Sequence, residues 1–362
     1  MIINRYLLRE ITKPLAIILG TLVALFAGYS VNSFLSDAVN GLLPTGAIAE
    51  LTGLKVLISL EVLIPASLYV SVLVSFARLY GESEFTAMFA LSITPAAIVR
   101  TVLTLAGCLA VIVGGLSLFV RPWAYQRLHE LSSSAATLLD VDAMQAGSFY
   151  VDQDGARVIF LAHRAGPGSP ARNVFLKLRR KDRTEIISAR LAHTLPQAVP
   201  NTGSQVYLSD AYIYEVDREG GQADQILQAQ GIVVNPNSRR GEPPGYSAVA
   251  ASTARLAGSS SSEDIAEFQW RLSTPLSTLL LGMLGVPLAR TKPRESRYSK
   301  FAIAILAYFG YYLLFTSART WVQHGAIARV PGIWWVPALL TLVLLTTTYI
   351  PTLAFTFRRG RA

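Results

Sequence analysis

Six long apolar stretches constrain this chain more than any motif does, because they determine which solvent surrounds it. Each is close to the roughly 20 residues that a helix needs to cross about 30 Å of hydrocarbon, and each is apolar on all sides. In chain order they cover residues 14–35, 56–77, 101–120, 272–289, 301–318 and 330–357. The sequence therefore predicts a membrane protein with six transmembrane helices, three on either side of a polar insert.

The positive charges gather on one side of these predicted helices. The short loops on the opposite side hold only Lys55, Arg319 and Arg329. By the positive-inside rule both termini face the cytoplasm, and the insert lies outside because it follows three crossings. In a bacterium this places the chain in the inner membrane and the insert in the periplasm. The basic residues of the inner side are Arg5, Arg9, Lys13, Arg78, Arg100, Arg290, Lys292, Arg294, Arg297, Lys300, Arg358, Arg359 and Arg361.

The formal net charge of +9 follows from this topology and does not indicate a nucleic-acid partner. Within residues 121–271 the basic and acidic residues are equal in number, so the insert is neutral. The excess positive charge lies in the membrane segments and their cytoplasmic loops, a pattern that is typical of membrane orientation. The single cysteine, Cys108, lies inside the third apolar stretch, so no intrachain disulfide is expected.

The insert shows the alternation of an all-β domain. Between Gly147 and Asn235 apolar residues recur with a period of two, in short runs separated by turn residues. A sandwich, jelly roll or barrel follows from this pattern. Such a fold either fills its interior with side chains or leaves a slot for an apolar ligand, and the alternation is compatible with both. The predicted strands are 148–151, 157–163, 174–180, 185–193, 205–215 and 225–234.

The segments around the β domain complete the predicted organisation. Helical linkers are expected near 123–139 and 264–270, and the Gly-, Pro-, Ser- and Ala-rich run 239–263 is typical of a flexible return segment. Before Pro14, apolar residues at helical spacing fit either an amphipathic helix in the headgroup layer or an extension of the first transmembrane helix. The predicted regions are 1–120 with three transmembrane helices, 121–270 with the periplasmic β domain, and 271–362 with three more helices and a basic tail.

The chain carries no sequence signature of catalysis or of a resident cofactor. It has no G-x-x-x-x-G-K-[ST] loop for nucleotide phosphates and no G-x-S-x-G turn for a nucleophile. Its histidines are far apart and have no Cys or acidic residue at metal-ligand spacing. We therefore expect a non-enzymatic protein with no metal site and no cofactor in this chain. The histidines are His129, His163, His193 and His324.

Two ionisable residues in or next to the apolar stretches are candidates for function. Glu61 is the only charged residue inside any of the six stretches, one to two turns from the outer end of the second. It either serves a specific function, as intramembrane ionisable residues often do, or reaches the interface. Arg319 closes the outer end of the fifth stretch, where it either extends to lipid headgroups or binds an anionic substrate.

The cytoplasmic loop 80–95 is acidic and aromatic on an otherwise basic side. We expect Ser83 to cap a short helix there, with an acidic residue in its first turn. Such a helix suits a groove of a cytoplasmic partner, and the alternative is a solvated helix that lies on the bilayer. The candidate contact residues are Glu82, Glu84, Phe85, Met88 and Phe89.

With this loop, the chain resembles the LptF/LptG permease family of the lipopolysaccharide ABC exporter, and its LptF branch more than its LptG branch. The matching segments are MIINRYLLRE at the N-terminus, LIPASL in the second apolar stretch, LYGESE in the loop, Pro122-Trp123, and Gln269-Trp270-Arg271. The resemblance extends over essentially the whole chain, including the three-plus-three arrangement of apolar stretches.

The resemblance implies partners and a substrate. In this family an LptF-like and an LptG-like subunit form a heterodimer on an LptB-like ATPase dimer, which binds the ATP and Mg²⁺. LptC-like and LptA-like periplasmic proteins complete the pathway. Lipopolysaccharide enters a central cavity from the outer leaflet, and closure of that cavity pushes it into the periplasmic β-jelly roll.

The resemblance also implies roles for individual positions. Glu84 is expected to pair with a basic residue of the ATPase, and Arg319 to face lipid A phosphates. Ser30, Asn32 and Ser33 stand at the outer end of the first helix, where some relatives carry basic residues. In the fifth predicted strand, Tyr207 and Ile213 are candidates for lining an acyl slot.

Two other functions fit the same sequence. One is an ABC permease that transmits force to a periplasmic partner without carrying lipid itself, which requires no acyl slot. The other is a membrane-anchored sensor or assembly scaffold, for which the loop 80–95 is dispensable.

Overall fold

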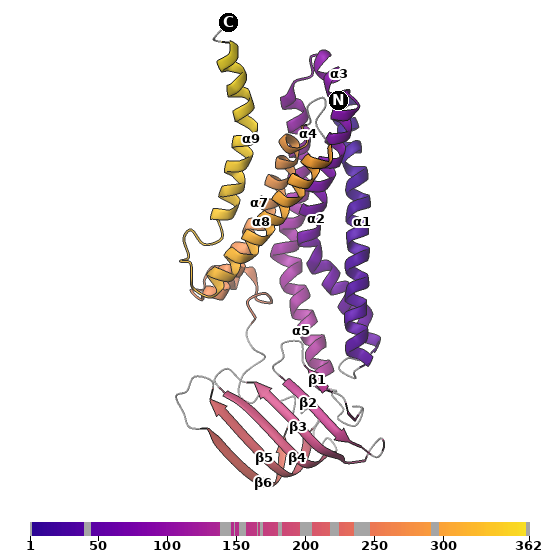
Figure 1. The fold of residues 1–362 in the computed structure, drawn as a ribbon, viewed down its shortest axis with the longest axis vertical. Coiled ribbons are helices and arrows are strands. Elements are labelled where there is room, and N and C mark those ends of the chain that lie inside the picture. Colours follow the sequence, from indigo (N-terminus) through magenta and orange to yellow (C-terminus); the bar gives the residue numbers. More distant parts are fainter. Residues whose placement is uncertain are drawn as a thin grey trace. The chain divides into compact units, whose positions relative to one another are not determined.

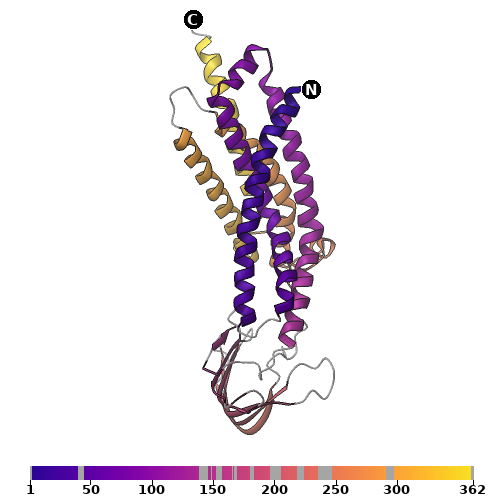
Figure 2. The same ribbon diagram turned by 90° about the vertical axis from the view of Figure 1, so that its right-hand side faces the viewer.

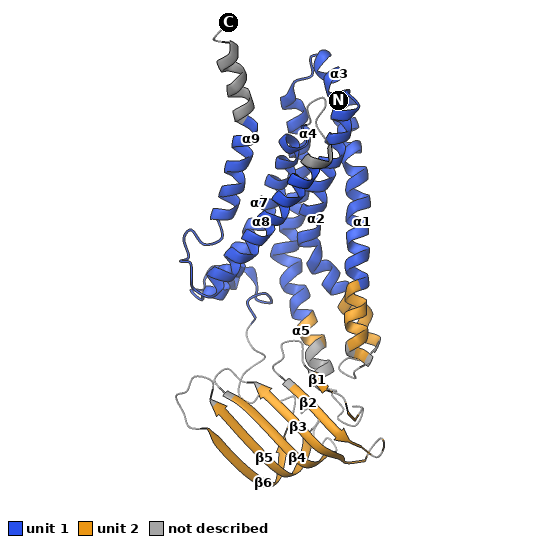
Figure 3. Cartoon of the chain, in the orientation of Figure 1, with its two compact units in different colours: residues 1–28, 53–127, 246–362 blue, residues 29–52, 128–245 orange. Residues whose placement is uncertain are grey.

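The computed structural model describes most of the chain as two compact units (Figure 3). Unit 1 contains residues 1–28, 53–127 and 246–362, and unit 2 contains residues 29–52 and 128–245. The described residues are 2–39, 45–137, 146–147, 149–151, 157–164, 166, 169–179, 183–195, 205–217, 224–234, 247–290 and 297–359.

Unit 1 is built from helices, most of them long (Figures 1 and 2). Their lengths follow from the apolar stretches. Pro95 occupies the first position of its helix, where proline is well tolerated because the missing N–H has no intrahelical partner there. The helices, some of which extend into unit 2, are α1 (Ile2–Val39), α2 (Ile48–Gly81), α3 (Glu84–Ala90), α4 (Pro95–Gly115), α5 (Arg121–Thr137), α6 (Thr253–Ala257), α7 (Ser262–Leu288), α8 (Arg297–Gln323) and α9 (Trp335–Arg359).

Four helical segments among the described residues are long and apolar enough to cross a membrane. They are Ile2–Ser36, Ile48–Gly81, Pro95–Leu131 and Phe301–Gln323, and Trp335–Thr348 is a shorter apolar helix. The fourth predicted stretch falls in α7, which is more polar because it buries several hydroxyl side chains. Ser273, Thr274 and Ser277 each donate to the backbone carbonyl four residues earlier, so these polar groups are satisfied inside the helix.

The N-terminal residues extend the first long helix, which is the second of the two alternatives considered for them. Leu7 and Ile11 are buried in the helical core. Pro14 lacks an N–H and so leaves the Glu10 carbonyl without its usual partner. The Ser75 hydroxyl of α2 donates to this carbonyl at 2.8 Å, which fastens α2 to α1 at the proline.

Helices α2 and α7 approach closely because α7 presents glycine to α2. A Cβ atom at Gly282 would lie 2.9 Å from Leu68, and one at Gly285 would lie 3.0 Å from Val72. Small residues at a helix interface allow two backbones to come together and increase van der Waals contact where water supplies no driving force. This contact places α7 against the centre of α2.

Unit 2 contains a six-stranded antiparallel sheet in the order β1-β2-β3-β4-β5-β6. Every described strand pairs with its sequence neighbours, so the sheet is a meander, and Figure 2 shows that it is curved. The described strands do not include the Greek-key crossover that defines a jelly roll. The strands are β1 (Phe149–Val151), β2 (Arg157–His163), β3 (Ala171–Arg179), β4 (Arg183–Leu195), β5 (Gln205–Asp217) and β6 (Gln225–Val234).

The inner face of this sheet changes phase at a kink. In β5, Val206 and Leu208 are buried before Asp210, and Ala211 and Ile213 are buried after it. Asp210 has a positive φ of 52° and drops out of the pairing on both sides, so the alternation shifts by one residue. The kink keeps both halves of a long strand facing one apolar core.

The last part of the predicted flexible return segment is packed against α7. Ala248, Ala251 and Leu256 are buried and form a small apolar cluster with Phe268. The earlier part of the predicted segment, residues 239–246, lies outside the described residues. The composition of this run therefore misled the prediction for residues 247–261, because backbone carbonyls there are used as hydrogen-bond acceptors by α7.

Candidate functional site

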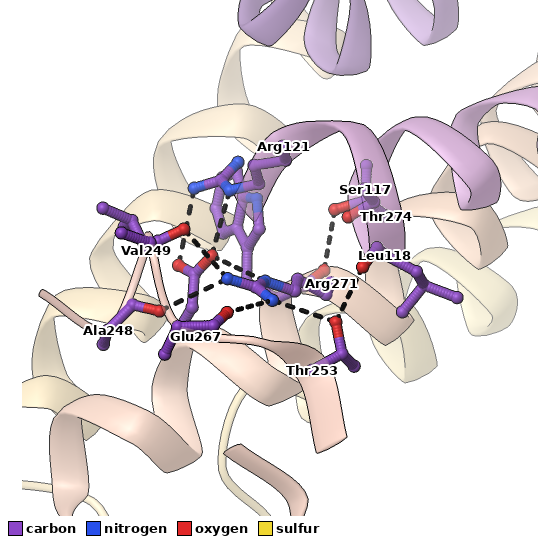
Figure 4. Close-up of polar contacts among 12 residues, drawn as sticks. Ser117, Leu118, Arg121, Ala248, Val249, Thr253, Glu267, Arg271 and Thr274 are labelled. Atoms are coloured by element: carbon purple, nitrogen blue, oxygen red, sulfur yellow. Dashed lines mark hydrogen bonds and ion pairs between the residues drawn. The ribbon is translucent and has the colours of Figure 1, made fainter. Parts of the chain in front are cut away.

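A cluster of buried ionic side chains joins four helical elements of unit 1 (Figure 4). Its first member is positioned by a π-helical turn, Leu116–Val120, between α4 and α5. Such turns are frequent at functional sites because they interrupt the regular hydrogen-bond ladder. Here the Leu118 carbonyl accepts a hydrogen bond from the Thr253 hydroxyl at 2.8 Å, and Arg121 follows directly after the turn.

Glu61 of α2 lies in this cluster and is 1% exposed. It accepts hydrogen bonds from the Ser117 hydroxyl at 2.9 Å, from Arg121 Nη1 at 2.5 Å and from the Trp270 indole at 3.0 Å. A carboxylate inside a helical bundle is costly unless it is paired and fully hydrogen-bonded. The only charge inside the six apolar stretches is therefore satisfied by three donors.

Glu267 of α7 is the centre of the cluster and is fully buried. Its two oxygens accept from Arg121 at 2.9 and 3.4 Å, from Arg271 Nε at 3.0 Å and from Arg319 Nη2 at 2.8 Å. One carboxylate thus ties α5, α7 and α8 together.

Arg271 connects this centre to the segment before α7. Its guanidinium is fully buried and donates to the carbonyls of Ala248, Val249 and Ala251 and to the Thr253 hydroxyl, at 2.9 to 3.3 Å. Glu267 and Arg271 are four residues apart on α7, so they share one face of that helix. Arg271 therefore holds residues 248–253, the segment that precedes α7, against that helix.

Arg319 of α8 is the most exposed member, at 20% of its side chain. Its guanidinium lies 4.8 Å from the centre of the Trp270 ring, which is the geometry of a cation–π contact. Its Nε is buried and has no hydrogen-bond partner among the described residues. Three arginines and two glutamates leave the cluster with one excess positive charge, and Arg319 is the member through which that charge reaches the surface.

A second candidate site is the short helix α3, at the same end of unit 1 as the N-terminus (Figure 1). Glu84 is partly buried and accepts a hydrogen bond from the Tyr6 hydroxyl of α1 at 2.7 Å. The expected cap is wrong: Ser83 precedes the helix with a φ of 59° and makes no side-chain cap hydrogen bond. The left-handed backbone turns its hydroxyl away from the amides that a cap would satisfy.

The aromatic side chains of this helix also differ from the prediction. Phe85 is 1% exposed and packs between Phe76 and Tyr80, with ring centres 5.1 and 4.5 Å away, so it anchors α3 and is not displayed. Met88 is partly buried against the same core. Phe89 is 40% exposed, and together with the exposed Glu82 it forms the outward surface of this corner.

Comparison with known proteins decides the class. The family profile described as "Lipopolysaccharide export system permease LptF/LptG" matches residues 5–350. The chain belongs to this family. It is also similar to the lipopolysaccharide export system permease protein LptF of Escherichia coli K12 and of Shigella flexneri, each 27% identical over 359 residues, which cover 95% of this chain and 93% of the relative.

The other residues predicted to contact lipid in this LptF/LptG protein lie in different surroundings. Ser30 is buried and its hydroxyl has no partner among the described residues, whereas Asn32 is exposed and Ser33 is partly buried. In the sheet, Ile213 belongs to the buried core, while Tyr207 points to the other face and contacts the ring of His193 at 5.0 Å. The two β residues therefore do not line one common slot.

Sequence reasoning missed most of the ionic cluster of this LptF/LptG protein. Arg121 and Glu267 lie just outside the apolar stretches: Glu267 falls in the predicted linker 264–270, and the sequence analysis assigns no role to Arg121. The spacing of Glu267 and Arg271 on one helix face, next to Trp270, was the signal that could have identified them. Among the described residues, no group of three His, Cys, Asp or Glu side chains is arranged to hold a metal ion.

Proposed function

We propose that this chain is the LptF-like permease subunit of an ABC transporter that extracts lipopolysaccharide from the outer leaflet of the inner membrane. Lipopolysaccharide then passes into the periplasmic β domain and on toward the outer membrane. Membership of the LptF/LptG family, the apolar helices and the antiparallel sheet support this function. The proposed partners are an LptG-like subunit, an LptB-like ATPase dimer that supplies ATP hydrolysis, and LptC-like and LptA-like periplasmic proteins.

The proposed topology has six transmembrane helices, with α7 and α9 completing the four longer spans. Both termini and α3 then lie on the cytoplasmic side, where the basic residues gather. Glu61 is 20 residues from Gly81, about 30 Å along α2 at 1.5 Å per residue, which equals the thickness of the hydrocarbon core. The ionic cluster therefore stands at the outer boundary of the membrane. We further propose that the meander is part of a jelly roll.

The observation that carries the coupling to an ATPase is the construction of α3. Phe85 fixes this helix in the core formed by α2, and the Glu84 carboxylate is oriented by Tyr6. A helix held in this way transmits a push from a cytoplasmic partner to α2 and α1 without being deformed. Glu82, Glu84 and Phe89 supply an acidic and apolar surface for such a partner.

For the lipid path, we propose that the excess positive charge at Arg319 receives a phosphate of lipopolysaccharide. The guanidinium is partly exposed and is oriented by Glu267 and Trp270. Arginine suits this role because its planar fork of donors matches phosphate oxygens.

The test compares two substitutions that affect the same hydrogen bond. Glu84→Lys removes the acid and reverses its charge, whereas Tyr6→Phe removes only the intrachain donor and leaves the acid free for a partner. We expect Glu84→Lys to abolish copurification of the ATPase and lipopolysaccharide export, and Tyr6→Phe to retain both. Normal growth and normal outer-membrane lipopolysaccharide with Glu84→Lys would refute the coupling role. A wild-type chain that purifies without any ATPase would favour the sensor or scaffold function.

A further inference from the structure

An apolar cavity of about 640 Å³ lies in unit 1, apart from the ionic cluster. Its walls come from α6, α7, α9 and the turn between α8 and α9, with Leu256, Phe268, Trp334, Trp335 and Ala338 among the lining residues. The volume falls within the range of roughly 300–1,000 Å³ that small-molecule sites have. None of these side chains takes part in the ionic network described above.

The wall of this cavity is held in place by Gln269. Its Nε2 donates to the Arg329 carbonyl at 2.8 Å, and its Oε1 accepts from the Ile333 amide at 2.8 Å. Gly332, between these two contacts, has a φ of 55°, and a Cβ atom there would collide with the Gln269 amide. The turn is therefore fastened to α7 on both sides of a glycine that the geometry requires.

One polar group of the lining is free to meet a ligand. The Arg329 side chain is exposed and makes no ion pair with the residues that the structure describes. An apolar space with one cation at its edge matches a molecule with an acyl chain and an anionic group.

The position along the chain matches the outer boundary of the membrane. Phe301 to Gln323 of α8 spans about 33 Å at 1.5 Å per residue, slightly more than the hydrocarbon core. The turn that carries Arg329 begins after Gln323, at the opposite end of unit 1 from α3 (Figure 1). This is the depth at which acyl esters and phosphates of the outer leaflet are found.

We propose that this cavity binds one acyl chain of an outer-leaflet glycerophospholipid, whose phosphate pairs with Arg329. This inference rests on the membrane orientation given under Proposed function and not on transport of lipopolysaccharide. A single cation at the edge of a cavity of this size suits one phosphate and one chain. Lipopolysaccharide, with several chains and more than one phosphate, requires a larger space and more cations.

The test uses vesicles that contain phosphatidylglycerol with a photoactivatable diazirine on one acyl chain. Peptide mapping after illumination of the wild-type chain is expected to show labelling at Phe268 and Ala338. Ala338→Trp fills the cavity and is expected to lower labelling of Phe268 by about tenfold, because overpacking a built space costs binding. Leu339→Trp, at an exposed neighbouring position of α9, is the matched control and is expected to leave it unchanged.

One further variant tests the polar contact. Arg329→Gln is expected to remove any preference for phosphatidylglycerol over zwitterionic phosphatidylcholine of the same chains.

Three outcomes would overturn the proposal. They are labelling no stronger than on the exposed face of α8, labelling that Ala338→Trp does not reduce, and labelling that purified lipopolysaccharide displaces at a lower concentration than phosphatidylglycerol does. Lipopolysaccharide extraction is measured in parallel. Cavity labelling without extraction would support the phospholipid site while refuting the transport function, so the two failures are distinguishable.

Discussion

Replacing Glu267 by glutamine removes the negative charge at the centre of the ionic cluster while retaining the shape of the side chain. Arg121 then keeps Glu61 as its partner, and Arg271 keeps its backbone carbonyls and Thr253. Arg319 loses its only ion-pair partner among the described residues and retains the Trp270 ring. Of the three buried or half-buried cations, only Arg121 would still contact a carboxylate of the cluster, Glu61.

The expected cost follows from what is left unpaired. Removing one partner of a buried ion pair typically destabilises a protein by about 3–5 kcal/mol, because the remaining charge stays desolvated. We expect Glu267→Gln to lie near the lower end of this range, at about 3 kcal/mol, because its amide oxygen still accepts one hydrogen bond. For a folded unit of about 150–250 residues, this corresponds to a fall of roughly 6–12 °C in the unfolding midpoint.

The assay is thermal unfolding of the purified chain in detergent, monitored by the loss of monodisperse protein. Glu263→Gln, at an exposed position one turn earlier on α7, is the matched control and is expected to stay within about 0.5 kcal/mol of wild type. Adding Arg319→Gln to Glu267→Gln removes the orphaned cation, so the double variant should be less destabilised than the two effects summed. A midpoint equal to that of the control, or strict additivity, would refute the proposed network.

Four other substitutions test packing and backbone geometry. Phe85→Ala should destabilise the chain by about 3–5 kcal/mol and Phe89→Ala by at most about 1 kcal/mol, because only the first ring is buried; equal unfolding midpoints would contradict this. Ser75→Ala should cost about 1 kcal/mol, since it leaves a partly buried carbonyl without this donor next to a helix proline, and an unchanged midpoint would argue against that bond. Gly332→Ala should cost about 1–3 kcal/mol through its positive φ and its clash with Gln269, and wild-type resistance of the turn to proteolysis would count against it.

The strands were predictable because each half-buried strand alternates apolar and polar residues, and this alternation is visible within a few neighbouring residues. Residues 157–163 and 225–234 were placed with the bounds that the structure gives β2 and β6, and the other strands differ by one to three residues at their ends. The phase shift at Asp210 was not foreseen, since a kink depends on backbone conformation and not on the period of apolar residues.

The ionic cluster was only partly predictable because its members are far apart in the sequence. Glu61 stood out as the only charge within the apolar stretches, but its partners Arg121 and Trp270 are 60 and 209 residues away. No local pattern links such positions, because the contact is created by the packing of α2, α5 and α7. In α3 the sequence predicted a helix that displays its aromatic rings, whereas the structure buries Phe85. Ser83, which precedes this helix, has a left-handed backbone conformation that the sequence pattern does not indicate.

The π-helical turn at Leu116–Val120 determines how the following helix, α5, is rotated about its own axis. A π turn holds one residue more than an α-helical turn, and one residue corresponds to about 100° of rotation in an α-helix. Arg121 therefore faces Glu61 and Glu267 because of an insertion upstream of it, and removing any single residue from this turn would swing its guanidinium toward a different neighbour. The number of residues in this turn, as much as the identity of Arg121, therefore determines where the guanidinium lies.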